Sequence, residues 1–425
     1  MKRSFTILLA LVLALSLVLA ACQPKAPAAT ETSGGESGGE TTAKTQTLVI
    51  GFTASQTGKY NVSSGRQVNG LNLWMKQINE AGGIKLSDGT VVTFKAVSYD
   101  DESNKDRVQE LYTRLATEDN ADLLISPYSS GLTAAAAVIA EQYGKVMLTT
   151  GAASDATYKQ GYTKVFQMYT PASRYLTGAV DLLAKTDPSV KKVAFVYENS
   201  KFSTAVVEAA KEYAASKGYD VVLFEGYDPE TTDFGPFINK IQDAGAEAIL
   251  GGGHFQDGSA FARQLYEKNV PVKFVTLLVA PPEPDFADLG DAAVGIIGPS
   301  QWEPLAAFKP DFGPTGKEFE DAYMAAYSEE PSYHSAGGYA AGLVLEKAIR
   351  DADSTDPDAI KAALDNMDLT LFFGKIKFDT SPEAHGLQIG HSMIYIQWQK
   401  DGDKLGKQVV WPEDGATAEV LYPLH

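Results

Sequence analysis

Residues 48–83 of this chain read LVIGFTASQTGKYNVSSGRQVNGLNLWMKQINEAGG, and their pattern decides the fold. The short apolar run at 48–53 is typical of a buried strand. Apolar side chains then recur at helical spacing, at Val68, Leu71, Met75 and Ile78. Ala81-Gly82-Gly83 follows as a glycine-rich helix stop. The stretch therefore predicts a strand, a polar loop, a helix and a glycine cap, in that order.

The same alternation continues on both sides of residue 170. In the first half we predict strands at 91–99, 121–126 and 146–150 and helices at 106–115 and 132–143. In the second half we predict strands at 192–197, 221–224, 248–250 and 272–278, and helices at 206–216, 233–241 with Asp233 as N-cap, and 261–268. Short apolar strands separated by helices favour parallel sheets covered on both faces. The fold class is thus α/β, with two such halves and a helical section at 318–366 that covers one sheet.

The composition excludes several classes of function. The 425 residues carry 54 acidic against 36 basic side chains, a formal net charge of −18, which argues against nucleic acid or an anionic lipid as partner. The five histidines form no close metal pair, and neither a P-loop nor a dinucleotide fingerprint occurs. Ser129-Ser130 lacks the Gly-x-Ser-x-Gly elbow of hydrolases. We expect no enzyme activity, no catalytic residue, no cofactor and no metal.

The amino-terminal segment has the layout of an export signal. Lys2 and Arg3 precede an apolar run at 5–21, and the run is followed by Cys22, so that residues 19–22 read Leu19-Ala20-Ala21-Cys22. The run is barely long enough for a helix that crosses a membrane. This ending resembles the bacterial lipobox, in which the cysteine is acylated and the chain is cut before it. We therefore expect a signal peptide at 1–21 and lipidation of Cys22, the single cysteine of the chain. Residues 22–45 lack bulky apolar side chains and are predicted to be a disordered tether. The protein would be exported and anchored to the outer face of the bacterial cell membrane.

Two loops are the best candidates for a ligand site, because parallel sheets bind ligands beyond the carboxyl ends of their strands. The strand at 121–126 runs into Pro127-Tyr128-Ser129-Ser130-Gly131, where hydroxyls and backbone amides meet a helix start, an arrangement suited to a carboxylate. The strand at 146–150 runs into Gly151-Ala152-Ala153-Ser154, where small residues allow close approach to the backbone. Simple helix capping by Ser129, Ser130 and Ser154 is the alternative.

Several motifs together resemble one known family. They are Val49-Ile50-Gly51, Thr57-Gly58, Ile78-Asn79-Glu80-Ala81-Gly82-Gly83-Ile84, Tyr99-Asp100-Asp101, Pro127-Tyr128-Ser129-Ser130, Gly151-Ala152-Ala153-Ser154, Thr232-Asp233-Phe234 and Gly374-Lys375-Ile376-Lys377-Phe378-Asp379. In this order and spacing they resemble the branched-chain amino acid binding family of type I periplasmic substrate-binding proteins. The resemblance covers residues 48–411.

The resemblance implies a monomeric solute receptor of an ATP-binding-cassette importer, whose permease and ATPase are other chains. Its fold would be two doubly wound lobes joined by three crossovers, here near 168–171, 299–302 and 390–392. One lobe would comprise 46–169 and 302–391, and the other 170–301 and 392–425. The ligand would lie in the cleft, and closure of the lobes would complete its contacts.

Residue by residue, the resemblance assigns Ser130 to the ligand carboxylate and the backbone of Gly151 to its head group. Ala153 stands where amino-acid binders often have threonine, and Leu278 where they have an acid for the ligand ammonium. Phe202 and His254 take the place of tyrosines on the second wall. A buried ammonium without a counter-charge is strongly disfavoured, so an α-amino acid would need another acid, for which the candidates are Asp257 and Glu303.

We expect the solute to be an amino acid or an amino-acid-like molecule with a carboxylate or amide head and an apolar or aromatic body. The predicted ligand-binding residues are Tyr128, Ser129, Ser130, Gly151, Ala153, Ser154, Phe202, His254, Leu278 and Trp302. For Tyr128, Phe202 and Trp302, packing in the core or hinge is an equal alternative. A ligand-sensing ectodomain of the same fold is the other possible function, and a surface hydrolase is a weaker one.

Overall fold

The computed structural model describes residues 44–306 and 308–424. The predicted signal peptide, Cys22 and the tether as far as residue 43 lie outside the described residues. The tether was predicted to end at Thr45, but that residue is the first of strand β1 (Thr45–Ala54). Among the described residues, every helix is too short or too polar to cross a membrane.

The first lobe is built on a six-stranded sheet in the order β2-β3-β1-β4-β5-β6. Its strands after β1 are β2 (Ile84–Lys85), β3 (Val91–Asp100), β4 (Leu123–Ile125), β5 (Val146–Thr149) and β6 (Val165–Gln167). All pairs are parallel except β2 with β3. Residues of β1 alternate between two hydrophobic clusters, with Ile50 in one and Val49 in the other, so both faces of this sheet are covered.

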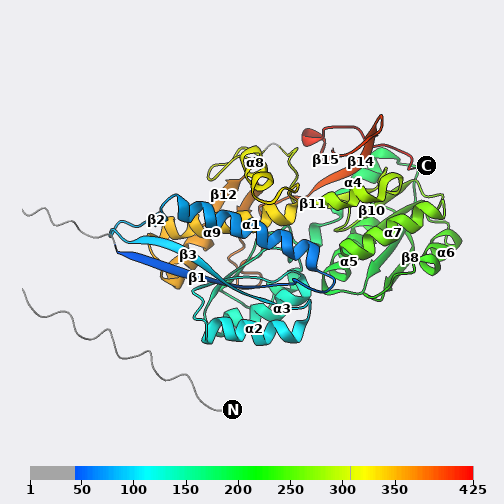
Figure 1. The fold of residues 1–425 in the computed structure, drawn as a ribbon. Coiled ribbons are helices and arrows are strands. Elements are labelled where there is room, and N and C mark those ends of the chain that lie inside the picture. The colour runs from blue at the N-terminus through cyan, green and yellow to red at the C-terminus, as the bar shows by residue number, and fades with distance from the viewer. Residues whose placement is uncertain (1–43, 307, 425) are drawn as a thin grey trace, which may run out of the picture. The chain divides into compact units, whose positions relative to one another are not determined.

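Helices from two separate parts of the chain cover this sheet. Figure 1 shows α1 (Asn61–Glu80) and α9 (Tyr333–Ala352) on one side, and α2 (Lys105–Thr117) and α3 (Ser130–Gln142) on the other. The first lobe also contains α8 (Gly316–Tyr327), α10 (Pro357–Asp365) and the hairpin of β12 (Asp368–Leu371) and β13 (Gly374–Lys377). Glycines allow α1 and α9 to touch, because a Cβ at Gly70 would lie 1.9 Å from the carbonyl oxygen of Ser335.

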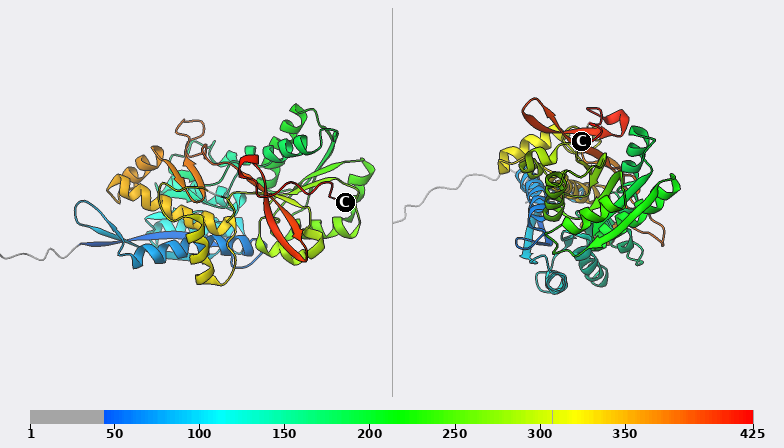
Figure 2. Two further views of the ribbon diagram at one scale, coloured as in Figure 1. Left: turned by 90° about the horizontal axis from the view of Figure 1, so that it is seen from above. Right: turned by 90° about the vertical axis from the view of Figure 1, so that its right-hand side faces the viewer.

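The second lobe is built on a seven-stranded sheet in the order β15-β14-β11-β10-β9-β7-β8. Its strands are β7 (Lys192–Glu198), β8 (Asp220–Tyr227), β9 (Ala248–Gly252), β10 (Phe274–Leu277), β11 (Ile297–Ser300), β14 (Ile394–Asp401) and β15 (Lys404–Trp411). Its helices are α4 (Thr177–Thr186), α5 (Lys201–Ser216), α6 (Gly235–Asp243) and α7 (Phe255–Glu267). Strands β14 and β15 add an antiparallel edge that the sequence pattern did not predict, and in Figure 2 they are the red strands against the green lobe.

The chain passes between the lobes three times, after β6, after β11 and after β13. The predicted fold class, two doubly wound lobes joined by three crossovers, is therefore confirmed. Local boundaries differ: α7 begins at Phe255, six residues before the prediction, and Phe234 rather than Asp233 is the N-cap of α6. The Asp233 carboxylate still accepts a hydrogen bond from the amide of Gly235, at 2.9 Å. The residue-level lobe boundaries stay predictions.

Candidate functional site

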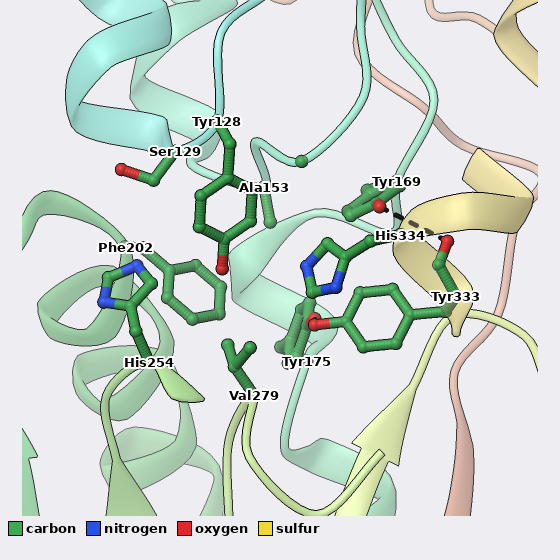
Figure 3. A pocket seen from close by; sticks show the side chains of 11 residues that line it. Tyr128, Ser129, Ala153, Tyr169, Tyr175, Phe202, His254, Val279, Tyr333 and His334 are labelled. Carbon is green, nitrogen blue, oxygen red and sulfur yellow. Dashed lines mark hydrogen bonds between the residues drawn. The ribbon is translucent and has the colours of Figure 1, made fainter. Parts of the chain in front are cut away.

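A small cavity lies where the carboxyl ends of the parallel strands of both lobes meet. The first lobe and the crossover after β6 contribute Tyr128, Ser129, Gly151, Ala153, Tyr169, Tyr333 and His334, and the second lobe contributes Tyr175, Phe202, His254 and Val279 (Figure 3). The space between these side chains is about 10 Å³, which is roughly the room that one water molecule needs. A solute of ten or more heavy atoms can enter only if the lobes separate or the side chains move.

Six of the ten predicted ligand-binding residues line this cavity. They are Tyr128, Ser129, Gly151, Ala153, Phe202 and His254. The other four, Ser130, Ser154, Leu278 and Trp302, are buried elsewhere. A role in ligand binding stays a prediction for all ten.

The Ser130 hydroxyl is engaged within the protein. Its Oγ accepts hydrogen bonds from the backbone amides of Ala153, at 3.0 Å, and Ser154, at 3.1 Å. These amides belong to the group that we expected to hold a ligand head. The capping alternative is wrong for this loop, because neither Ser129 nor Ser154 makes a side-chain capping bond to its helix. Instead, Ser130 ties the loop after β4 to the loop after β5.

Trp302 and Leu278 pack in the cores of opposite lobes. The Trp302 ring meets Phe319 and Phe372 edge to face, at centroid distances of 5.4 and 5.7 Å. Leu278 belongs to the same hydrophobic cluster as Phe202, and its amide donates to the carbonyl of Gly251 at 2.8 Å. Its neighbour Val279 is the residue that reaches the cavity. For Trp302, this placement fits the packing alternative.

Gly151 is required by its conformation as well as by the space around it. Its φ of +88° is one that side-chain-bearing residues rarely adopt. A Cβ at this position would lie 2.4 Å from Oε1 of Gln67 and 2.7 Å from Cδ2 of Tyr128. Any larger residue would displace these two side chains, so the close packing of this loop against Gln67 and Tyr128 depends on glycine at position 151.

Tyr128 is the central ring of the site. It lies edge to face against His254, with centroids 5.8 Å apart, and against His334, at 5.0 Å. Burial raises the pKa of the Tyr128 phenol well above its ordinary value, so the hydroxyl is neutral and can donate a hydrogen bond. Tyr175 packs against Phe202 on the second lobe, at 5.2 Å. The cavity is therefore suited to a flat apolar or aromatic body.

A buried ion pair joins the lobes beside His334. Arg66 of α1 donates from Nη1 to Oε2 of Glu283, which follows β10, at 2.6 Å, and from Nη2 to Asp285 at 2.9 Å. Glu283 also accepts from Nδ1 of His334 and from Oγ of Ser63. Burial opposes ionisation of Glu283, but His334 and Arg66 outweigh it and lower the pKa of the carboxyl to about 2. One carboxylate of the second lobe is thus held by three side chains of the first.

A second, weaker set of contacts mirrors the first beside His254. Glu198, the last residue of β7, accepts from Nδ1 of His254 at 2.6 Å and from Nζ of Lys59, across the cleft, at 3.3 Å. Burial opposes ionisation of Glu198 as well, yet His254 and Lys59 lower its pKa to about 2. The His254 amide donates to Asp257 at 2.8 Å, which anchors this residue at the start of α7.

The two acids considered as partners for a ligand ammonium do not line the cavity. Asp257 accepts from the hydroxyl of Tyr227 at 2.5 Å, and Glu303 pairs with Lys407 at 2.7 Å. Burial raises the pKa of both carboxyls. The described residues that line the cavity include no acid and no Lys or Arg. The charged groups of Glu198 and Glu283 do not line the cavity but contact His254 and His334.

Sequence reasoning missed five lining residues, namely Tyr169, Tyr175, Val279, Tyr333 and His334. Tyr169 lies within the first predicted crossover and Tyr175 lies just after it, and their proximity to that hinge was the available signal. Tyr333 and His334 open α9, where Ser332 accepts from the His334 amide at 3.2 Å. This helix start follows no strand, so the rule on carboxyl ends of strands could not point to it.

Comparison with known proteins identifies what this architecture is similar to. The family model described as periplasmic binding protein matches residues 47–403. The Leu/Ile/Val-binding protein homolog 7 of Brucella melitensis biotype 1 is 25% identical over 366 residues, which are 83% of this chain and 88% of that protein. Homolog 8 of Brucella abortus is 24% identical over 373 residues, with 83% and 87% covered.

Solved structures share the fold at lower identity. The branched-chain amino acid transporter substrate binding protein LivJ from Streptococcus pneumoniae, in complex with isoleucine, has a TM-score of 0.71 and 22% identity, and covers 86% of this chain and 100% of that one. A solute binding protein of an ABC transporter from R. palustris, in complex with 4-hydroxybenzoate, has a TM-score of 0.72 and 21% identity, covering 85% and 95%. At these identities the likeness concerns the fold.

Proposed function

Because this chain belongs to the periplasmic binding protein family, as the match over residues 47–403 shows, we propose that it captures a small organic solute in the cleft between its lobes. The observation that carries the proposal is the aromatic cavity at the junction of both lobes. Residues on each wall would contact the same solute, so binding would favour the closed arrangement. The branched-chain amino acid binding group of type I, which the sequence motifs resemble, is confirmed as the group of relatives.

The solute that we propose is an amino acid or a related small acid with an apolar or aromatic body. Five of the eleven lining residues are Tyr or Phe, and two are His, a composition that favours a flat body over a flexible polar one. Relatives of this fold were solved with isoleucine and with 4-hydroxybenzoate. The described lining residues offer no acid for an ammonium, which favours an aromatic acid over an α-amino acid.

Delivery of the solute would require membrane partners. We propose that the closed lobes dock on the permease of an ATP-binding-cassette importer, whose ATPase is a further chain, and that the protein acts as a monomer. Lipidation of Cys22 would keep it at the outer face of the membrane. A tethered receptor experiences a high effective concentration of its permease, which offsets the loss of captured solute by diffusion.

The role we propose is binding without chemical conversion of the solute. The relatives are named as binding proteins or as transporter substrate-binding proteins. The histidines of the cavity hydrogen-bond to Glu198 and Glu283 rather than to a serine or cysteine nucleophile.

A thermal-shift screen tests this function. We expect leucine, isoleucine, benzoate or 4-hydroxybenzoate to raise the melting temperature in proportion to the logarithm of its concentration. The matched control is Met324→Glu on the exposed face of α8, which lies away from the cavity and should keep the shift. A screen in which none of these solutes shifts the melting temperature would contradict the proposed solute class.

A further inference from the structure

Two buried imidazole nitrogens without a partner belong to histidines that line the cavity from opposite lobes. Nε2 of His254 and Nε2 of His334 have no hydrogen-bond partner among the described residues, although the two residues are only 4% and 1% exposed. Figure 3 shows the two rings on different sides of the cavity, with Tyr128 between them. A buried polar atom without a hydrogen-bond partner is destabilising. Two such atoms at one cavity therefore mark positions where a ligand would complete the hydrogen bonding.

The opposite nitrogen of each ring determines what Nε2 can do. Nδ1 of His254 bonds to Glu198 at 2.6 Å, and Nδ1 of His334 bonds to Glu283. An ionised carboxylate only accepts hydrogen bonds, so each Nδ1 must carry the hydrogen. In a neutral imidazole Nε2 is then a bare lone pair. The geometry of the two pairs thus leaves Nε2 as the acceptor in two histidines that line the cavity.

From this arrangement we infer that His254 and His334 are ligand-contacting acceptors, which select a solute carrying an N–H or O–H donor in addition to its acidic head. The inference deepens the proposed function and rests on it, since the solute must occupy the same cleft. The donor would be a hydroxyl, an amide or an amine. Amino-acid binders of this family have an acidic residue at the position of Leu278, where it pairs with the ligand ammonium. For an amine ligand, an imidazole hydrogen-bonded to an ionised glutamate would replace that acidic residue.

At His334 the opposite arrangement, a solute carboxylate on a protonated Nε2, is disfavoured by burial and by a neighbouring cation. Burial lowers the pKa of His334, although Glu283 opposes this effect. A second cation would also lie beside Arg66, which already pairs with Glu283 at 2.6 Å. The titratable groups around His334 are Arg66, Tyr128, Tyr169, Glu283 and Tyr333, and those around His254 are Lys59, Tyr60, Tyr128, Glu198 and Asp257.

Nitrogen NMR of the protein labelled with ¹⁵N-histidine tests the tautomers without any ligand. The variants His254→Phe and His334→Phe assign the two rings, and His254→Asn and His334→Asn serve where the phenylalanine variant does not fold. We expect Nδ1 to be protonated and Nε2 to be unprotonated in both rings at about pH 7.5. A hydrogen on Nε2 of either ring at this pH would overturn the inference.

A matched pair of probes tests the selection itself. 4-Hydroxybenzoate and benzoate differ by one hydroxyl, so we expect the wild-type protein to bind 4-hydroxybenzoate at least about tenfold more tightly. His254→Phe or His334→Phe should abolish most of this preference, whereas the control His385→Gln, whose side chain pairs with Asp365 in the first lobe, should keep it. Equal affinities in the wild type, or a preference that survives in both phenylalanine variants, would overturn the inference. If neither probe binds, the aromatic-acid part of the proposed function fails, and the NMR result alone decides the inference.

Discussion

Arg66 and Glu283 form a buried ion pair that bridges the two lobes, with 2.6 Å between Nη1 and Oε2. The two residues are 217 positions apart, and their side chains are 6% and 0% exposed. Each would face solvent if the lobes moved apart. The pair therefore stabilises the closed arrangement rather than either lobe by itself.

Removing the cation should open the lobes. Arg66→Met leaves the Glu283 carboxylate buried without its arginine partner, a change that typically costs about 3–5 kcal/mol. Separation of the lobes relieves this penalty, so we expect a larger radius of gyration in solution scattering and weaker solute binding. Lys76→Met, which removes an exposed ion pair on the same helix, is the control. An Arg66→Met variant as compact as the control would show that the pair does not hold the lobes.

Acid should act in the same direction as that substitution. The pKa of Glu283 is about 2 when closed, below its ordinary value of 4.5. Its stabilisation is thus present above about pH 4.5 and is lost as the pH falls toward 2. Burial also lowers the pKa of His334 below 6.5, so protonation favours the open arrangement as the pH falls below that value. Solution scattering from pH 7 to 3 should show expansion, and His334→Gln should reduce the part of the expansion that occurs above about pH 4.5. A compact wild-type protein throughout would contradict this coupling.

The sequence predicts the local strands and helices of each lobe, but not the contacts between the lobes. The pattern that distinguishes strands from helices depends on residues close together in the sequence. The pattern at 48–83 therefore predicted β1, α1 and the glycine stop correctly. Arg66 and Glu283 show no pattern of their own, because their meeting depends on how two lobes pack. Strand β15 also escaped prediction, because its residues are mostly half-buried at the sheet edge and lack a continuous apolar run.

The candidate site was predicted in part for the same reason. Tyr128 and Gly151 follow strands β4 and β5, so the rule on carboxyl ends of strands located them, whereas His254, which follows β9, was predicted from the family resemblance. His334 opens a helix that we predicted only as a covering layer. Ser130 illustrates a further limit: a hydroxyl at a helix start can serve a ligand or the backbone, and only the structure shows that it accepts from Ala153 and Ser154.

Two glycines provide a matched test of the floor of the site. Gly151 and Gly82 have similar φ values, +88° and +90°, but a Cβ at Gly82 would meet nothing within 4 Å. Gly82→Ala should therefore show only the conformational penalty, roughly 1 kcal/mol. Gly151→Ala should lose more stability in denaturant unfolding, and solute affinity should fall with it. Equal losses for the two variants would show that the contacts with Gln67 and Tyr128 are unimportant.

The proposed anchor is testable by fractionation. Cys22→Ser removes the thiol that lipidation requires, so we expect the protein to move from the membrane fraction to the soluble exported fraction. Thermal stability and solute binding should stay unchanged, because the cleft is built from residues far along the chain. A Cys22→Ser protein that remains with the membrane would contradict lipidation at this residue.

Binding of a small solute between the lobes is tested most directly by a crystal structure. Crystals grown with isoleucine and, separately, with 4-hydroxybenzoate should show the solute in contact with Tyr128 of the first lobe and with Phe202 or His254 of the second. The 10 Å³ cavity should be enlarged to fit it. Solute bound outside this cleft, or contacts confined to one lobe, would contradict the account.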